Sequence, residues 1–280
     1  MNETKRYYKP RWSVAAPIAF FSWLSITCLL TAPCTALAGP SPEDIMRKAI
    51  KAGKLDGSES LTTLVIYDAK GNKRVRKIAA ITKLYDGGKL EKRLIRFIKP
   101  ADVKGTGLLT FDYENKPDDM WLYMPALRKS RRILAADKAK SFMGSEFTYA
   151  DTSPPSVEDF NHKLLGEKAV DGVRCWVVAS VPKNDDIADE NGFGKKVSYI
   201  GKKDYTIRKA EYYDFDMKLH KVLTVHEVRE IDPAKHRFRP IRMTMINEKN
   251  GRKSELTMDK IQLRKDVPDD YFTLRYLERD

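Results

Sequence analysis

Short hydrophobic stretches separated by turn residues make up most of the chain after residue 54. Many are rich in β-branched and aromatic residues, which favour strands. They lie at residues 61–67, in a run that ends at 85, and at 90–98, 107–113, 120–124, 128–134, 172–181, 197–200, 208–213, 221–229, 238–247 and 252–263. Because no helical pattern separates them, we expect one antiparallel sheet. Asn250-Gly251 predicts a two-residue hairpin turn, and residues 152–157 and 183–194 are predicted as long loops.

One helix is predicted ahead of these strands. Ser41 suits the N-cap and Pro42 the first helical position, and two acidic residues follow them in the first turn. The apolar positions of the helix are Ile45, Met46, Ala49 and Ile50. The pattern ends at Gly53. Since the apolar positions form a single stripe, we expect this helix to lie on the sheet.

Several predicted strands are apolar on both faces. Cys175 and Val177 alternate with Trp176 and Val178, and residues 107–113 and 120–124 follow the same pattern. A sheet with one face in water would carry polar residues at every second position. We therefore expect a second layer over the sheet, formed by helices, by another sheet or by a ligand.

The first 38 residues have the three-part pattern of an export signal. Basic residues come first, an almost wholly apolar stretch occupies residues 14–30, and Ala36-Leu37-Ala38 supplies the small residues of a cleavage site. A membrane anchor is the alternative, because the apolar stretch is nearly long enough to span a bilayer. We expect cleavage after Ala38, a periplasmic location and a single domain over residues 39–280.

Charge and cysteine content narrow the function classes. The formal net charge is +13, and the leader contributes +3 of it (four basic residues and Glu3), which leaves +10. Such a surface suits anionic partners, among them lipid headgroups and acidic proteins, whereas export argues against nucleic acid. Cys175 is the single cysteine after residue 38, so no disulfide framework holds the domain.

No set of residues points to catalysis. The four histidines, His162, His220, His226 and His236, are scattered and lack the spacing of metal ligands. Adjacent aspartate pairs at 118–119, 185–186 and 269–270 are typical of turns, since neighbouring strand residues point to opposite faces. Cys175 lies in an apolar strand and is expected to be a buried thiol. We therefore expect neither an enzyme nor a cofactor or metal.

The stretch from Ile95 to Asp151 carries an ordered series of sequence blocks. They are Phe97-Ile98-Lys99-Pro100, Lys104-Gly105-Thr106-Gly107-Leu108-Leu109, Trp121-Leu122-Tyr123-Met124-Pro125, Arg131-Arg132-Ile133 and Phe142-Met143-Gly144-Ser145-Glu146-Phe147-Thr148-Tyr149-Ala150-Asp151. In this order they resemble the outer-membrane lipoprotein-sorting (LolA-like) family, in its uncharacterised branch. The stretch Val267-Pro268-Asp269-Asp270-Tyr271-Phe272-Thr273 is also similar, so the resemblance covers most of residues 39–280. Glu146 departs from the pattern, because the family more often has Asp there.

The resemblance implies a mainly β (α+β) fold. We expect a strongly curved antiparallel half-barrel, LolA/LolB-like, with helices covering its concave face. In the better-known members this cavity shelters lipoprotein acyl chains. The residues expected to line it are Leu109, Phe111, Trp121, Tyr123, Met124, Phe142, Met143, Phe147, Ile241, Met243 and Met245. The chain is then a monomeric carrier of lipid or lipoprotein acyl chains that works with an inner-membrane transporter. The alternative is a soluble accessory subunit of an inner-membrane RND-type exporter.

Two further segments each allow two interpretations. Arg128, Lys129, Arg131 and Arg132 form the densest basic run. It is either a solvated strand edge, where basic residues discourage aggregation, or a docking site for anionic headgroups or a membrane partner. Residues 142–151 place large apolar groups in a connection, with Gly144 permitting a sharp bend. We propose a gate over the cavity, and a fixed plug is the alternative.

Overall fold

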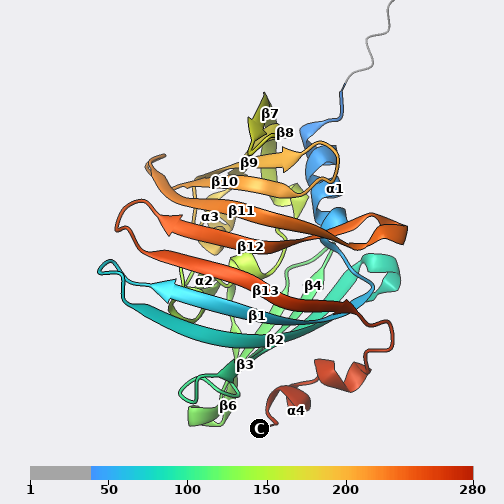
Figure 1. Ribbon diagram of the computed structural model, residues 1–280, viewed down its shortest axis with the longest axis vertical. Coiled ribbons are helices and arrows are strands. Elements are labelled where there is room, and N and C mark those ends of the chain that lie inside the picture. The colour runs from blue at the N-terminus through green and yellow to red at the C-terminus, as the bar shows by residue number, and fades with distance from the viewer. Residues whose placement is uncertain (1–38, 280) are drawn as a thin grey trace, which may run out of the picture. The chain divides into compact units, whose positions relative to one another are not determined.

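The computed structural model describes residues 39–279 (Figure 1). The predicted signal peptide, residues 1–38, lies outside the described residues. The strands are β1 (Gly57–Tyr67), β2 (Lys73–Tyr85), β3 (Leu90–Lys99), β4 (Gly107–Tyr113), β5 (Asp119–Met124), β6 (Lys129–Ile133), β7 (Phe160–Val170), β8 (Val173–Pro182), β9 (Lys195–Gly201), β10 (Ile207–Tyr213), β11 (Leu219–Asp232), β12 (Arg237–Asn247) and β13 (Lys253–Leu263). The α-helices are α1 (Pro42–Gly53), α2 (Ala135–Lys138), α3 (Asp185–Asn191) and α4 (Leu274–Leu277).

All 13 strands of the described part belong to one antiparallel sheet. The spatial order is β6-β5-β4-β3-β2-β1-β13-β12-β11-β10-β9-β8-β7, so two meanders meet at the pair β1–β13. In that pair Thr63 lies opposite Thr257 and Leu64 opposite Leu256. The sheet is strongly curved and does not close on itself, because β6 and β7 form its two ends. The predicted curved antiparallel fold is confirmed.

Helices α1, α2 and α3 lie on the concave side of this sheet (Figure 1). Helix α1 begins and ends where the sequence predicts, and the Ser41 hydroxyl accepts a hydrogen bond from the backbone N–H of Asp44 at 3.1 Å. Its apolar stripe packs on the sheet: Ile45 and Met46 are buried against Trp176, Val178 and Ile200. The helical cover that the resemblance implies is therefore present.

The segment after β13 packs on the opposite, convex face. Val267, Phe272 and Leu277 are buried there against Leu94, Leu109 and Tyr123. Arg96 of β3 holds the end of α4, because its guanidinium donates to the backbone carbonyl oxygens of Tyr276 and Leu277 at 2.8 and 3.1 Å. Gly107 allows this close contact, since a Cβ at that position would lie 2.6 Å from Leu277 Cδ1.

Several elements differ from the expectations, among them the short helices α2 and α4, which the sequence pattern does not predict. Strand β7 has no counterpart among the predicted strands. Residues 183–194, expected as a loop, contain α3, which Asn184 caps by accepting a hydrogen bond from the backbone N–H of Ile187 at 2.9 Å. The connection between β12 and β13 spans five residues rather than two, and Gly251 in it has a φ of +69°. The loop prediction for residues 183–194 and the two-residue hairpin are therefore wrong.

Candidate functional site

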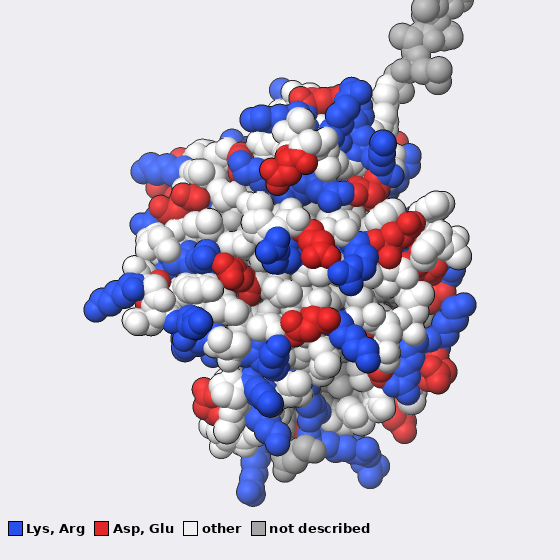
Figure 2. Space-filling model, in the orientation of Figure 1, with Lys and Arg blue, Asp and Glu red and all other residues white. Residues whose placement is uncertain are grey.

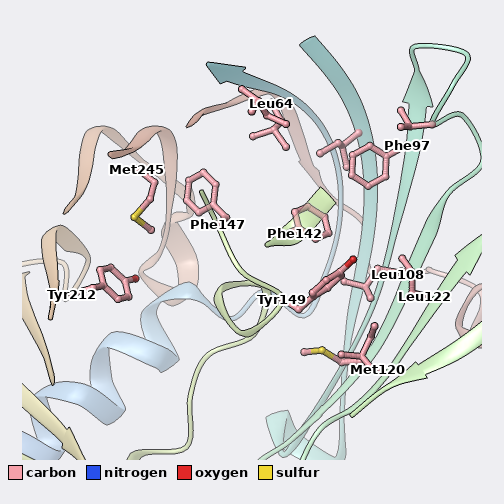
Figure 3. Close-up of a cluster of buried hydrophobic side chains, with 14 of the residues drawn as sticks. Leu64, Phe97, Leu108, Met120, Leu122, Phe142, Phe147, Tyr149, Tyr212 and Met245 are labelled. Carbon is pink, nitrogen blue, oxygen red and sulfur yellow. The ribbon is translucent and has the colours of Figure 1, made fainter. Parts of the chain in front are cut away.

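One loop, residues 141–149, lies in the middle of the concave side of the sheet, and we call it the inner loop. Its side chains Phe142, Phe147 and Tyr149 are 5%, 8% and 6% exposed. Figure 3 shows them pointing in different directions into the hydrophobic interior, Phe147 toward Met245 and Phe142 toward Phe97. The ring centroids of Phe97 and Phe142 are 5.7 Å apart, and those of Phe142 and Tyr149 are 5.6 Å apart. The inner loop therefore supplies the centre of the hydrophobic core.

The backbone of the inner loop is sharply bent. Met143 and Gly144 have consecutive positive φ angles of +53° and +78°. Glycine adopts this conformation without steric cost, whereas Met143 does so less readily. The bend lets the Phe142 N–H donate to the carbonyl oxygen of Phe147 at 2.8 Å. Residues 141 and 148 then form an isolated antiparallel bridge, so that the aromatic side chains project outward from a compact loop.

Glu146 ties the inner loop to the sheet. It is 5% exposed, and its Oε2 accepts a hydrogen bond from the side-chain amide of Asn247 at 2.9 Å. Its Oε1 lies 2.9 Å from Nε of Arg252. Its backbone N–H donates to Ser254 Oγ at 2.9 Å, and its carbonyl oxygen accepts from Nζ of Lys221 at 2.8 Å. A buried carboxylate needs such partners, and here they come from β11, β12, β13 and the turn between the last two.

Two arginines hold the bend itself. Nη1 of Arg76 donates to the carbonyl oxygen of Met143 at 2.5 Å, and Nη2 of Arg252 donates to that of Gly144 at 3.1 Å. At the end of the loop, the Asp151 carboxylate accepts hydrogen bonds from the backbone N–H of Thr148 at 2.9 Å and from its hydroxyl at 3.0 Å. The inner loop is thus fixed by polar contacts around an apolar centre.

The structure divides the predicted cavity residues between the two faces of the sheet. Those that pack in the concave interior are Met124, Phe142, Met143, Phe147, Met243 and Met245. Those that pack on the convex face, under the C-terminal segment, are Leu109, Phe111, Trp121 and Tyr123. Ile241 is buried at 3% exposure and belongs to neither cluster. One interior ligand therefore cannot contact the whole set. On β4 and β5 the interior positions are Leu108, Met120 and Leu122.

The basic run lies at the β6 edge of the sheet. All four of its basic side chains are exposed. Arg131 and Arg132 form ion pairs with Asp137 and Asp119, whereas Arg128 and Lys129 have no ion pair within the described residues. Leu127 and Leu134 flank the run and are 60% and 61% exposed. In the view of Figure 2, basic side chains predominate toward the lower end of the molecule, where β6 lies in Figure 1.

The structure also has a cleft lined mainly by charged and polar residues, which we call the polar cleft. It has a volume of about 1280 Å³ and lies between α1, the β2–β3 turn, the β4–β5 loop and residues 153–159. Its lining includes Asp112 and Asp118, which are mostly buried, and several lysines. Burial, reinforced by the charges of Asp118 and Glu91, raises the pKa of Asp112 to about 7. Burial also raises the pKa of Asp118, although Lys138 opposes that effect.

Other buried charges beside this cleft have partners. Glu91 is 3% exposed and pairs with Arg93, which also donates to the carbonyl oxygen of Thr152. Arg93 and other cations lower the pKa of Glu91 despite its burial. Lys138 pairs with Glu190 at 2.5 Å and lies 3.9 Å from Asp118. These contacts join β3, the inner loop's C-terminal flank and helices α2 and α3.

The remaining titratable candidates have structural surroundings. Cys175 is fully buried, and burial raises its thiol pKa. His162 bridges Ser180 Oγ and the Val157 carbonyl oxygen at 2.8 and 3.0 Å, and burial lowers its pKa. Within residues 39–279, no group of three His, Cys, Asp or Glu side chains has the arrangement of a metal site. No helix in this range is long and apolar enough to cross a membrane.

Two important residues, Glu146 and Asp112, are not among the predicted site residues. Glu146 stands out in the sequence only as a departure from a family pattern, although it is the main polar anchor of the inner loop. The signal that was available is a lone acidic residue between apolar positions in Phe142-Met143-Gly144-Ser145-Glu146-Phe147. Asp112 was not singled out either. Its position between Phe111 and Tyr113 in an otherwise apolar strand was the corresponding signal.

Comparisons with known proteins agree with this architecture. A model of a family of uncharacterized proteins matches residues 89–279. No curated protein matches the sequence. A crystal structure of a Vibrio parahaemolyticus domain, described as an outer membrane lipoprotein-sorting protein, is 26% identical with a TM-score of 0.77 and covers 85% of this chain and 98% of its own.

Two more solved structures are similar. A DUF1329 family protein from Desulfovibrio piger is 27% identical with a TM-score of 0.77, over 84% of this chain and 97% of its own. A LolA superfamily protein from Nitrosomonas europaea is 19% identical with a TM-score of 0.65, over 85% of this chain and 99% of its own, and it shares the fold. The protein therefore has the fold seen in the LolA superfamily structure, and it belongs to the family of uncharacterized proteins whose model matches residues 89–279.

Proposed function

We propose that the protein is a periplasmic carrier that shelters the acyl chains of a lipid or lipoprotein during transfer toward the outer membrane, without covalent chemistry. The observation that carries this proposal is the inner loop. A curved, unclosed sheet has an apolar concave side, and the centre of that side is occupied by a loop held by polar contacts, beside the helices that cover it. The name of the similar Vibrio parahaemolyticus domain, which describes lipoprotein sorting, points the same way.

In this proposal an acyl chain takes the place of the aromatic side chains of the inner loop. Burying one CH₂ group is worth ~0.8 kcal/mol, so a chain with about 15 of them gains on the order of 12 kcal/mol. Exposing a large apolar side chain costs roughly 1.5–3 kcal/mol. Exposing Phe142, Phe147 and Tyr149 therefore costs less free energy than burial of the acyl chain gains. The difference is available to break the polar contacts of Glu146.

The flexible thioethers in the interior support the same role. Met124, Met243 and Met245 lie on the concave side together with Met143 of the inner loop. Methionine adapts to ligands of different shape at little conformational cost. The interior residues are therefore our cavity candidates, whereas the convex-face group would act by supporting β4 and β5.

We further propose that the exposed basic run docks the carrier on anionic headgroups or on a membrane partner. Arg128 and Lys129 have no ion pair within the described residues and lie beside Leu127, which is 60% exposed. Basic side chains attract an anionic surface, and a projecting leucine can enter its apolar layer. A monomer that meets an inner-membrane transporter at this edge completes the proposed cycle.

The experiment that tests the carrier is lipid extraction and mass spectrometry of the protein purified from the periplasm. A stoichiometric lipid or lipopeptide is expected, and fluorescent fatty acid should exchange with it. A second candidate function, an accessory subunit of an inner-membrane RND-type exporter, is favoured by the fact that the protein's own side chains fill the interior. Protein that carries no lipid and binds no fatty acid, yet co-purifies with an exporter, would replace the carrier proposal with this one.

A further inference from the structure

The polar cleft contains one buried carboxylate without a counter-ion. Asp112 is 7% exposed and lines the cleft, and its Oδ2 has no hydrogen-bond partner. Its neighbours differ: Glu91 pairs with Arg93, and Asp118 has Lys138 at 3.9 Å. An unpartnered buried carboxylate oxygen is costly, so a hydrogen-bond donor that enters the cleft would be stabilising there.

A second unpartnered group lies in the same cleft. Ser153 is 8% exposed, lines the cleft, and its Oγ also has no hydrogen-bond partner. Asp112 and Ser153 come from β4 and from the segment after the inner loop, so two separate parts of the chain direct unused polar atoms into one hollow. Asp112 Oδ2 can accept a hydrogen bond, and the Ser153 hydroxyl can accept one while its own proton faces Asp118, whose pKa it lowers. A ligand group with several N–H donors is therefore complementary to both atoms.

Basic residues also line the cleft. Lys51, Lys89, Arg237 and Lys265 contribute to its lining, and none of them has an ion pair within the described residues. An anionic group attached to the donor would therefore be favoured beside these cations. The cleft therefore holds two unused acceptor atoms and four cations without ion pairs in the described part, and its lining also includes the exposed acids Asp86 and Glu114.

We infer that this cleft binds an amphoteric phosphate ester, with a primary ammonium group beside Asp112 and Ser153 and the phosphate among these four cations. A primary ammonium supplies three N–H donors, whereas a quaternary ammonium supplies none and is normally bound by an aromatic cage. The two tyrosines that line the cleft, Tyr85 and Tyr113, already carry lysine ammonium groups over their rings. This chemistry occurs in the headgroup of an aminophospholipid and in a free ester such as phosphoethanolamine.

Binding should depend on pH because Asp112 must be ionised. Its pKa is about 7 in the ligand-free protein. The groups that face it are Asp118 from the β4–β5 loop, Glu91 and Arg93 from β3, and Lys54 after α1. Arg93 and Lys54 favour the ionised form, whereas Asp118 and Glu91 oppose it. An ammonium ion would favour ionisation, so affinity is expected to be high at pH 8 and to fall as the pH decreases below about 7.

The test is isothermal titration calorimetry of the purified protein at pH 8. Phosphoethanolamine should bind, and phosphocholine, which has the same charges without N–H donors, should bind at least ten-fold more weakly. Asp112→Asn should lose at least ten-fold in affinity for phosphoethanolamine, and Ser153→Ala should lose a smaller factor. Glu248→Gln is the control, since Glu248 is exposed and lies outside the cleft lining, and the affinity of this variant should stay within two-fold of the original.

Equal binding of the two esters, unchanged binding by Asp112→Asn, or no binding of phosphoethanolamine would each overturn the inference. Circular dichroism checks that the variants are folded. If Asp112→Asn does not fold, the affinity of Ser153→Ala decides the test. Dihexanoyl phosphatidylethanolamine identifies the source: tighter binding than phosphoethanolamine indicates a lipid headgroup, and equal binding indicates a free ester. The lipid source rests on the proposed carrier function. Dihexanoyl phosphatidylglycerol, which has no ammonium group, distinguishes this inference from the carrier proposal. If it binds as tightly as dihexanoyl phosphatidylethanolamine, the cleft does not select an ammonium group and the inference is wrong, whereas the carrier proposal still stands.

Discussion

The side-chain amide of Asn247 in β12 donates a hydrogen bond to Oε2 of Glu146, 2.9 Å away, although 101 residues separate them in the chain. The contact joins the inner loop to the second meander of the sheet. Arg252 adds an ion pair at 2.9 Å from the turn that follows β12. An aromatic loop inside an apolar interior is therefore positioned by one buried carboxylate rather than by its hydrophobic side chains alone.

Replacing that carboxylate should loosen the inner loop. Glu146→Gln keeps the shape but removes the charge that Arg252 faces, and Arg252 is partly exposed, which moderates the loss. We expect the free energy of unfolding to fall by about 1–3 kcal/mol. Hydrogen exchange should become faster in residues 142–149. The control is Glu255→Gln, which removes an ion pair with the partly exposed Lys253. Its free energy of unfolding should stay within about 0.5 kcal/mol of the original. Unchanged exchange in the loop would show that Glu146 is not its anchor.

Shortening Phe147 separates a packing role from a gating role. The side chain is 8% exposed in the concave core, so Phe147→Ala should lose about 3–5 kcal/mol of stability. It should also raise affinity for a fluorescent fatty acid, because the substitution vacates interior volume. Leu109→Ala is a matched control on the convex face, where Leu109 is 1% exposed. It should cost about 2–5 kcal/mol without changing fatty-acid affinity. Lost stability with unaltered binding in both variants would make the inner loop a permanent plug.

Charge reversal at the β6 edge tests docking. Arg128→Glu with Lys129→Glu should weaken binding to vesicles that contain phosphatidylglycerol by ten-fold or more, since each basic residue near an anionic surface contributes about 1 kcal/mol. The effect should shrink at high salt. Lys163→Glu with Lys168→Glu makes the same change in net charge on β7, where both lysines are exposed, and should have little effect. Equal losses in the two double variants would show that only net charge matters.

The buried Asp112 carboxyl predicts a pH-dependent stability difference. Its pKa of about 7 lies above the ordinary value of 3.8, so the folded protein retains a proton that the unfolded chain releases. The Asp112 carboxyl therefore makes its full contribution to the free energy of unfolding below pH 3.8, and this contribution is lost as the pH rises toward 7. Relative to the original, Asp112→Asn should be more stable at pH 8, by up to roughly 4 kcal/mol, and this advantage should disappear near pH 4. Urea unfolding at both pH values measures it, and a constant difference would contradict the assignment.

The elements that the sequence predicts well have complete local signals. Helix α1 has its Ser41 cap, its proline and its terminal glycine, and β4 has a largely apolar run that begins at Gly107. Helix α3 had comparable signals, with Asn184 as cap, acidic residues in the first turn and Gly192 at a φ of +73°. Its acidic composition led to the loop interpretation instead. Strand β7 lacked the alternation of a strand, because a bulge between Leu164 and Gly166 interrupts its register.

The face on which a residue lies could be predicted only in part. Strand alternation places Leu108 and Leu109 on opposite faces of the sheet, and the structure confirms this. Which of the two faces becomes concave depends on the curvature of the whole sheet and on where the C-terminal segment packs. No local pattern carries that information. The candidate set was therefore divided between the faces, whereas Phe142 and Phe147, which lie outside any strand, were correctly expected to pack on apolar partners.

The pairing of β1 with β13 has a consequence for how the protein folds. Each meander is built from neighbouring hairpins that can form as the chain emerges, but the two halves are joined only when residues 254–263 meet residues 58–66. Contacts between such distant segments carry a large loop-closure entropy and slow folding. Until they form, β1 presents an unpaired edge with apolar side chains such as Leu64 and Ile66. We therefore expect the first half of the chain to be the aggregation-prone part until the last strand pairs with β1, so that a holding chaperone would act on it before then.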